Sequence, residues 1–164
     1  MYDFIDRPVT TLDRGGRFLV WSMRSWVAAM GEKRCPVGAI AQAFRAWNML
    51  PALVPFVRMM ELFNRHGRDN FQFCALSCNH VSEHEAIIIS LVCALRGQAP
   101  NQLHRVLDLL VGEEATEELV QSISSLGGRM EAASIFPMPP QLPGHSGGSD
   151  ADGHQLPPSA SDWS

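Results

Sequence analysis

The segment Ala86–Leu95 is the longest apolar run in the chain, and only Ser90 interrupts it. Because its apolar side chains would cover nearly the whole circumference of a helix, other elements must enclose it. A membrane span needs about 20 apolar residues in a row, so this run is too short to cross a bilayer. The segment therefore predicts a central helix inside a bundle of other helices.

The boundaries of this helix are visible in the flanking residues. Ser82 is followed three residues later by Glu85, which is the sequence pattern of a capping box. Gly97 is a residue type that commonly follows the last turn of a helix. The sequence thus predicts a helix from Glu83 to about Arg96.

The rest of the chain as far as residue 135 also has a helical pattern. Apolar residues recur at three- and four-residue spacing, and no alternating strand pattern is sustained. Capping residues, glycines and prolines divide it into helices predicted at residues 13–31, 36–48, 51–66 and 101–112 and from 113 to about 130. Residues 68–81 are predicted to be a long connection whose aromatic side chains fold back on the core. The predicted fold class is all-α, a compact bundle of five or six short helices in a domain of residues 1–135.

Composition changes abruptly after this domain. Residues 136–164 are rich in Pro, Gly and Ser and contain neither Arg nor Lys. Such a segment buries too little apolar surface to offset the entropy lost on ordering. We therefore expect residues 136–164 to form a disordered tail.

Several features indicate a cytoplasmic protein without a membrane partner. Asp3 and Asp6 stand where a secretory signal would carry positive charge. The four cysteines, at positions 35, 74, 78 and 93, are unevenly spaced and do not match a disulfide framework. In the cytoplasm they would remain reduced.

Charge is distributed unevenly along the chain. Residues 7–68 have a net charge of +7, whereas residues 69–135 have a net charge of −6. The two halves could attract each other within one molecule or across a dimer, or one of them could meet a charged partner. Solvated helix faces would give the same count without any partner.

One group of residues has the donor types of a metal site: Cys74, Cys78, His80 and His84, with Glu85 beside them. Thiolate and imidazole donors are typical zinc ligands, so we consider zinc or iron bound there, and otherwise expect no cofactor. Common structural zinc sites separate two ligand pairs by a dozen residues or more, whereas these four lie close together in sequence. A redox-responsive thiol is a second interpretation. In the third, the cysteines are buried apolar residues, and His84 and Glu85 belong to a solvated helix start.

A second group lies on one face of the first predicted helix: Arg14, Arg17, Trp21 and Arg24. Arginine and tryptophan are enriched at protein interfaces, so this face is a candidate site for another protein or for a second copy of the chain. Alternatively, Trp21 is partly buried beneath the arginine stems. Nucleic acid is disfavoured as a partner because the second half is acidic and the formal net charge is −4.

No sequence motif indicates catalysis. We find no phosphate-binding glycine loop, nucleophile elbow, dinucleotide fingerprint or paired-carboxylate site. The leading hypothesis is a cytoplasmic helical interaction or regulatory domain without catalytic activity. The alternative is a metal-binding or thiol redox-responsive regulator that uses the Cys74–His84 group.

Two short motifs resemble a family of small helical proteins from alphaproteobacteria, a domain of unknown function. They are the segments Asp13–Leu19 and Cys78–Ala86, in which a cysteine and an acidic residue followed by Ala open an apolar helix. The resemblance covers residues 13 to about 130. It implies a helical domain and carries no activity. A twelve-to-one preference for Arg over Lys is compatible with a bacterial origin.

Overall fold

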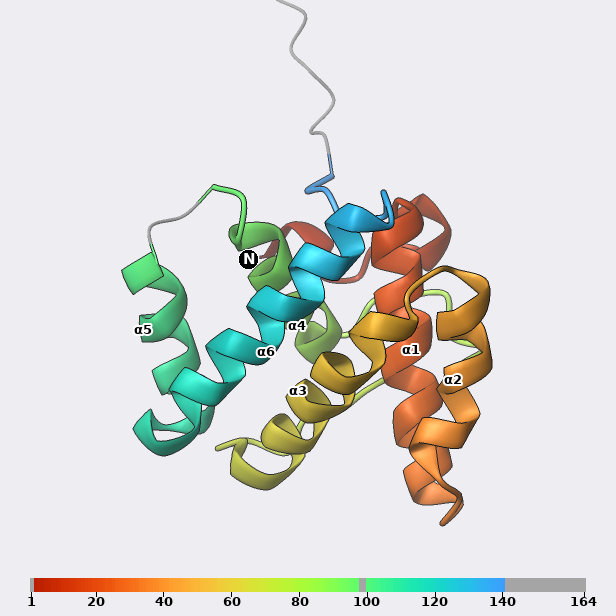
Figure 1. The fold of residues 1–164 in the computed structure, drawn as a ribbon, viewed down its shortest axis with the longest axis horizontal. Helices are drawn as coiled ribbons and strands as arrows, with labels where there is room; N and C mark the ends of the chain where they lie inside the picture. Colours follow the sequence, from red (N-terminus) through yellow and green to blue (C-terminus); the bar gives the residue numbers. More distant parts are fainter. Residues whose placement is uncertain (1, 98–99, 141–164) are drawn as a thin grey trace, which may run out of the picture.

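A computed structural model describes residues 2–97 and 100–140. Within these ranges the chain forms six α-helices and three short 3₁₀ helices (Figure 1). The α-helices are α1 (Arg14–Gly31), α2 (Pro36–Ala46), α3 (Leu53–His66), α4 (Glu83–Ala94), α5 (Pro100–Val111) and α6 (Glu113–Ala132); the 3₁₀ helices are η1 (Tyr2–Phe4), η2 (Val9–Thr11) and η3 (Leu50–Ala52). The described ranges contain no strand, only an isolated bridge between Pro8 and His80. The predicted all-α bundle is confirmed.

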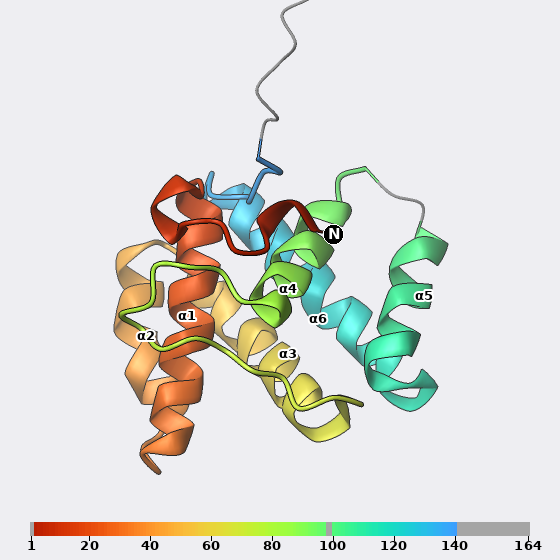
Figure 2. The same ribbon diagram turned by 180° about the vertical axis from the view of Figure 1, so that it is seen from behind.

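The helices are arranged around α4 and α6. α1 packs against α2, and α6 packs against both α3 and α5 (Figures 1 and 2). α4 contacts α1, α6 and η1, and five of its apolar residues are buried: Ala86, Ile88, Ile89, Leu91 and Val92. The predicted central helix is therefore confirmed. None of the described helices combines the length and apolar character needed to span a membrane.

Side-chain caps begin two of the helices as predicted. Asp13 Oδ1 accepts a hydrogen bond from the Gly16 N–H at 2.7 Å and so caps α1. Ser82 Oγ accepts from the Glu85 N–H at 3.4 Å, and the Glu85 carboxylate accepts from the Ser82 N–H at 2.9 Å. These bonds complete a capping box at α4.

The domain extends further toward the C-terminus than the sequence indicated. Phe136 and Pro137 are buried, and the Arg96 guanidinium lies over the Phe136 ring at 4.0 Å from its centroid. The Met138 N–H donates to Asp13 Oδ2 at 2.9 Å. The predicted start of the tail at residue 136 is wrong, because these residues close the bundle over the start of α1. The remainder of the predicted tail, residues 141–164, lies outside the described residues.

The segment before α1 holds the long connection in place. Phe4 and Leu12 are buried in the core, although the sequence analysis assigned no structure to residues 2–12. Asp6 N–H donates to Val81 O at 3.0 Å, and Val81 N–H donates to Arg7 O at 3.0 Å. These bonds attach the end of the predicted 68–81 connection to the N-terminal segment, and thus bring the connection across α1 (Figure 2).

Candidate functional site

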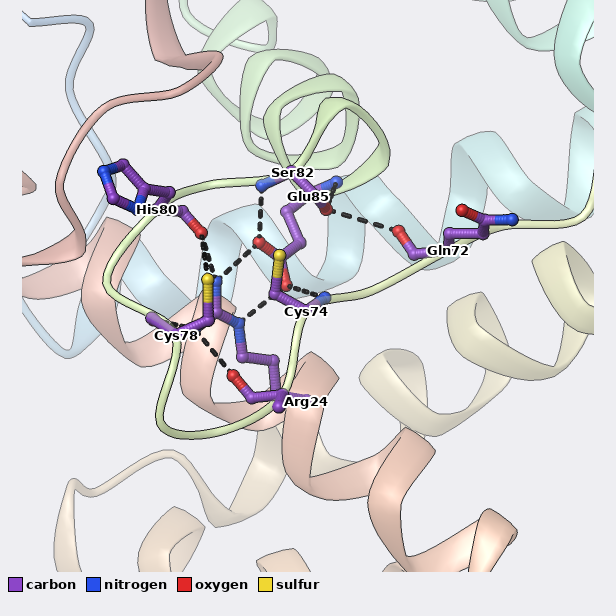
Figure 3. A network of polar contacts seen from close by, with 8 residues as sticks. Arg24, Gln72, Cys74, Cys78, His80, Ser82 and Glu85 are labelled. Carbon is purple, nitrogen blue, oxygen red and sulfur yellow. Dashed lines mark hydrogen bonds and ion pairs between the residues drawn. The ribbon is translucent and has the colours of Figure 1, made fainter.

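Arg24 on α1 is the centre of a buried polar network (Figure 3). Its exposed fraction is 3%, and all five of its guanidinium N–H groups donate hydrogen bonds. Two go to the Glu85 carboxylate, from Nε to Oε1 at 2.7 Å and from Nη2 to Oε2 at 2.9 Å. The other three go to backbone carbonyls, from Nη1 to Ala75 at 3.2 Å and Cys78 at 2.5 Å, and from Nη2 to His80 at 2.7 Å. Arg24 therefore ties the 75–80 loop to α1.

Glu85 completes the network from the start of α4. Its side chain is fully buried, and besides pairing with Arg24 it accepts hydrogen bonds from the Cys74 N–H at 3.2 Å and the Ser82 N–H at 2.9 Å. The hydrogen bond with Glu85 raises the pKa of Arg24. One carboxylate thus caps α4, anchors the loop and neutralises a buried cation.

This network corrects two interpretations made from the sequence. Arg24 does not belong to an exposed partner-binding face, because the 75–80 loop covers the end of that face. Glu85 does not lie at a solvated helix start, since its side chain is buried against Arg24. Both residues were identified from their positions in α1 and α4, but their pairing across 61 positions has no signal in the sequence.

The loop places the thiols of Cys74 and Cys78 near each other and near the Arg24 guanidinium (Figure 3). Cys78 N–H donates to Ala75 O at 3.0 Å, which closes a turn between the two cysteines, and Cys78 Sγ donates to His80 O at 3.6 Å. Burial raises the pKa of the Cys74 thiol. A hydrogen bond with the His80 backbone lowers the pKa of the Cys78 thiol. The two thiols thus differ in pKa, and Cys78 is the more readily deprotonated of the two.

The two histidines of the candidate metal group lie apart from the sulfurs. The His80 ring points away from both thiols in Figure 3. His84 Nδ1 accepts a hydrogen bond from the Gln72 N–H at 3.1 Å, and its ring packs on Phe71 with centroids 4.7 Å apart. Residues 2–97 and 100–140 contain no group of three or more His, Cys, Asp or Glu side chains placed to hold a metal ion. Of the four candidate ligands, the structure brings together only Cys74 and Cys78.

The other three residues of the arginine–tryptophan face do remain at the surface. Arg14, Arg17 and Trp21 line an open groove of about 480 Å³, hereafter the Arg–Trp groove, together with Phe18, Ala43 and Trp47. Trp21 is 39% exposed and Trp47 37% exposed. The Arg14 guanidinium lies 5.4 Å from the centroid of the Trp47 ring. The groove thus combines two cations with two half-exposed indoles.

Trp47 is a groove residue that the sequence reading missed. Trp47 follows the buried Ile40 and Phe44 at helical spacing, which would place it inside the bundle, but it is the C-cap of α2, where the helical periodicity ends. Asn48 follows with a φ of 57°, and this left-handed turn redirects the chain toward η3. Asn48 was the available signal, because Asn is favoured at left-handed positions that terminate a helix.

The arginines differ in how their charge is compensated. Arg24 pairs with Glu85 and Arg58 with Glu118, so the basic first half does attract the acidic second half within one molecule. Arg14 and Arg17, by contrast, form no ion pair with any residue that the structure describes. Positive charge therefore remains available in the Arg–Trp groove.

A smaller hollow adjoins the groove. It has a volume of about 250 Å³ and shares Arg17 and Trp21 with the Arg–Trp groove. Cys78 and Arg24 lie along it, so it connects the groove to the thiol-bearing loop.

Comparisons with protein-family models, curated proteins and solved structures found no match. The groove and the adjoining hollow are therefore the candidate functional surfaces of the described residues.

The burial of Cys93 can be tested through the pH dependence of the free energy of unfolding. Cys93 Sγ donates to Pro137 O at 3.3 Å, and burial raises the pKa of this thiol from 9.0 to about 12. Above about pH 9 the unfolded chain loses this proton while the folded chain retains it, so the free energy of unfolding should fall as pH rises toward 12. Urea unfolding at several alkaline pH values measures this slope.

A cysteine variant isolates the contribution of Cys93. Cys93→Ala should show a shallower alkaline decrease than the parent protein, whereas Cys35→Ala, which removes an exposed thiol, should follow the parent slope. Equal slopes in all three proteins would contradict the assignment to Cys93.

Proposed function

We propose that this chain is a cytoplasmic, non-catalytic interaction domain that binds an acidic segment of another protein in the Arg–Trp groove. One observation carries the proposal. Arg14 and Arg17, neither of which has an ion-pair partner among the described residues, stand beside the half-exposed indoles of Trp21 and Trp47 in an open groove.

The chemistry of the groove favours a carboxylate-bearing peptide. Guanidinium groups bind carboxylates through paired hydrogen bonds. Tryptophan and arginine are also the side chains that most often dominate binding energy at protein interfaces. Phe18 and Ala43 add apolar lining to the groove, so an acidic segment that also carries apolar residues would fit both components.

Other partners fit this surface less well. A nonspecific nucleic-acid binder needs a basic surface of several cations, whereas this chain has a formal net charge of −4 and the groove carries two arginines. The cytoplasmic location is consistent with four cysteines that are all free thiols.

The proposal predicts which peptides the protein selects. The full-length protein is immobilised and screened against a displayed library of random peptides. We expect the selected peptides to be enriched in Asp and Glu together with aromatic or aliphatic residues, because carboxylates meet Arg14 and Arg17 while apolar side chains meet the indoles. Changing both arginines to Glu should weaken binding of a selected peptide at least about tenfold, measured by calorimetry.

The control makes the same change of charge elsewhere. Arg65→Glu/Arg105→Glu alters two exposed arginines outside the groove and should leave peptide affinity within about twofold of the parent. Circular dichroism confirms that both double variants are folded. Failure to enrich acidic peptides, or equal affinity for the groove variant, would overturn the proposal.

Sedimentation velocity distinguishes a partner protein from a second copy of the chain. The proposal expects a monomer over a wide concentration range. A dimer that dissociates in the Arg14→Glu/Arg17→Glu variant would overturn the assignment to another protein, because the chain's own acidic half would then fill the groove.

A further inference from the structure

We propose that Cys74 and Cys78 form a peroxide-reactive dithiol, in which Cys78 attacks a hydroperoxide and Cys74 then closes a disulfide with it. This assigns a modification site to the 74–80 loop that is independent of peptide binding in the Arg–Trp groove.

The position of the two side chains is the first observation behind the proposal. The two sulfurs lie near each other on the same side of the turn closed by the Cys78 N–H···Ala75 O bond (Figure 3). A disulfide requires the sulfurs to approach to about 2.05 Å. Since the two side chains are neighbours across one short turn, we expect the bond to form chiefly through side-chain rotation.

The backbone on both sides of the thiol pair is fixed by the buried ion pair. Cys74 N–H is bonded to Glu85, and Cys78 O is bonded to Arg24. These bonds hold the two cysteines at opposite ends of one short turn. The bond with the His80 backbone and the nearby Arg24 guanidinium lower the pKa of Cys78, which favours its thiolate, whereas burial raises the pKa of Cys74.

Both cysteines are partly exposed, but they differ in their position relative to the hollow beside Arg17 and Trp21. Cys78 lies along the open hollow beside Arg17 and Trp21, whereas Cys74 does not line it. A small hydroperoxide entering the hollow would thus meet Cys78 first. The remaining cysteines lack this arrangement: Cys35 is exposed in the segment before α2, and Cys93 donates to the Pro137 carbonyl.

The reaction balances with hydrogen peroxide as the oxidant. Cys78 first releases its proton, its thiolate attacks one peroxide oxygen, the O–O bond breaks, and the departing hydroxide takes up the released proton to leave as water. Cys78 is then a sulfenic acid. Cys74 sulfur attacks the Cys78 sulfur, the S–O bond breaks, and a second water leaves with the Cys74 proton. Overall, two thiols lose two electrons and two protons, and one peroxide is reduced to two waters.

The experiment treats fully reduced, full-length protein with one equivalent of hydrogen peroxide. We expect the mass to fall by two hydrogen atoms and two of the four thiols to become unreactive toward a thiol reagent. Peptide mapping should locate a bond between Cys74 and Cys78. A dithiol reductant should restore all four thiols.

Single variants test the order of attack. Cys74→Ser should stop the reaction at a Cys78 sulfenic acid, which dimedone labels. Cys78→Ser should lose dimedone labelling in the loop, and its remaining thiols should react at least about tenfold more slowly with peroxide. Cys35→Ser is the matched control, because it removes a thiol outside the loop and should oxidise at the parent rate.

Three results would overturn the proposal. The first is oxidation at Cys35 while Cys74 and Cys78 remain reduced. The second is labelling of Cys74 in the Cys78→Ser variant as rapid as labelling of Cys78 in the Cys74→Ser variant. The third is stoichiometric zinc or iron on the freshly purified protein with both loop thiols protected, which would favour the metal interpretation of this loop.

Discussion

Replacing Arg24 with Met should lower the free energy of unfolding by about 3–5 kcal/mol. The change leaves the Glu85 carboxylate buried without its cation and frees three loop carbonyls at residues 75, 78 and 80. Urea unfolding followed by circular dichroism measures the loss. Arg24→Lys should fall between the parent and the Met variant, because an ammonium has three donors where the guanidinium uses five.

A double-mutant cycle separates the pair from the rest of the network. Arg24→Met/Glu85→Leu removes both charges, so its loss should be smaller than the sum of the two single losses, by about 0.5–3 kcal/mol. Arg34→Met is the surface control, because its pair with Glu32 is largely exposed, and it should change stability by less than about 1 kcal/mol. Equal losses for Arg24→Met and Arg34→Met would contradict a buried, structural role for Arg24.

The helices were predictable because their signals are local. Two helix starts are indicated in the sequence by Asp13 and by the pair Ser82 and Glu85. In the structure each of these residues caps its helix. The run within Ala86–Leu95 required enclosure by other helices, and α4 is indeed enclosed. Capping and apolar periodicity depend on residues only a few positions apart. Both can therefore be recognised in the sequence without knowledge of the tertiary fold.

The buried network was not predictable because its partners are distant in sequence. Arg24 lies on the same face of α1 as the exposed Arg17 and Trp21, and only the path of the loop decides which of them is covered. That path depends on backbone bonds between Val81 and the N-terminal segment, a region without regular periodicity. Pairings of this kind follow from tertiary geometry rather than from a local pattern.

The candidate sites were predictable only where their residues are close together in the sequence. Arg14, Arg17 and Trp21 lie together because helical spacing places them on one face, but Trp47 joins them only through the packing of α2 on α1. Cys74 and Cys78 meet because a turn closes between them. His80 and His84 would join the thiols only if the backbone directed their rings toward the sulfurs. Instead, the His80 ring points away from the thiols, and His84 accepts a hydrogen bond from the Gln72 N–H.

The C-terminal closure of the domain makes Gly15 the most sterically constrained glycine of α1. A Cβ at this position would collide with the Ile135 carbonyl oxygen and lie 2.8 Å from the Pro137 nitrogen. These are backbone atoms in a segment fixed by three bonds: Ile135 N–H to Met130 O, Met138 N–H to Asp13, and the Cys93 thiol to Pro137 O. The neighbouring chain therefore cannot move aside as a flexible side chain could.

Gly15→Ala should consequently destabilise the fold, although alanine is the better helix former. Overpacking against fixed atoms costs about 1–3 kcal/mol and exceeds the gain in helix propensity, which is at most about 1 kcal/mol. Urea unfolding measures the difference. Gly128→Ala is the matched control in α6, because a Cβ there meets nothing within 4 Å, and it should stabilise the protein by about 0.5–1 kcal/mol. If Gly15→Ala stabilised the protein as much as Gly128→Ala, residues 135–137 could not be packed against the start of α1.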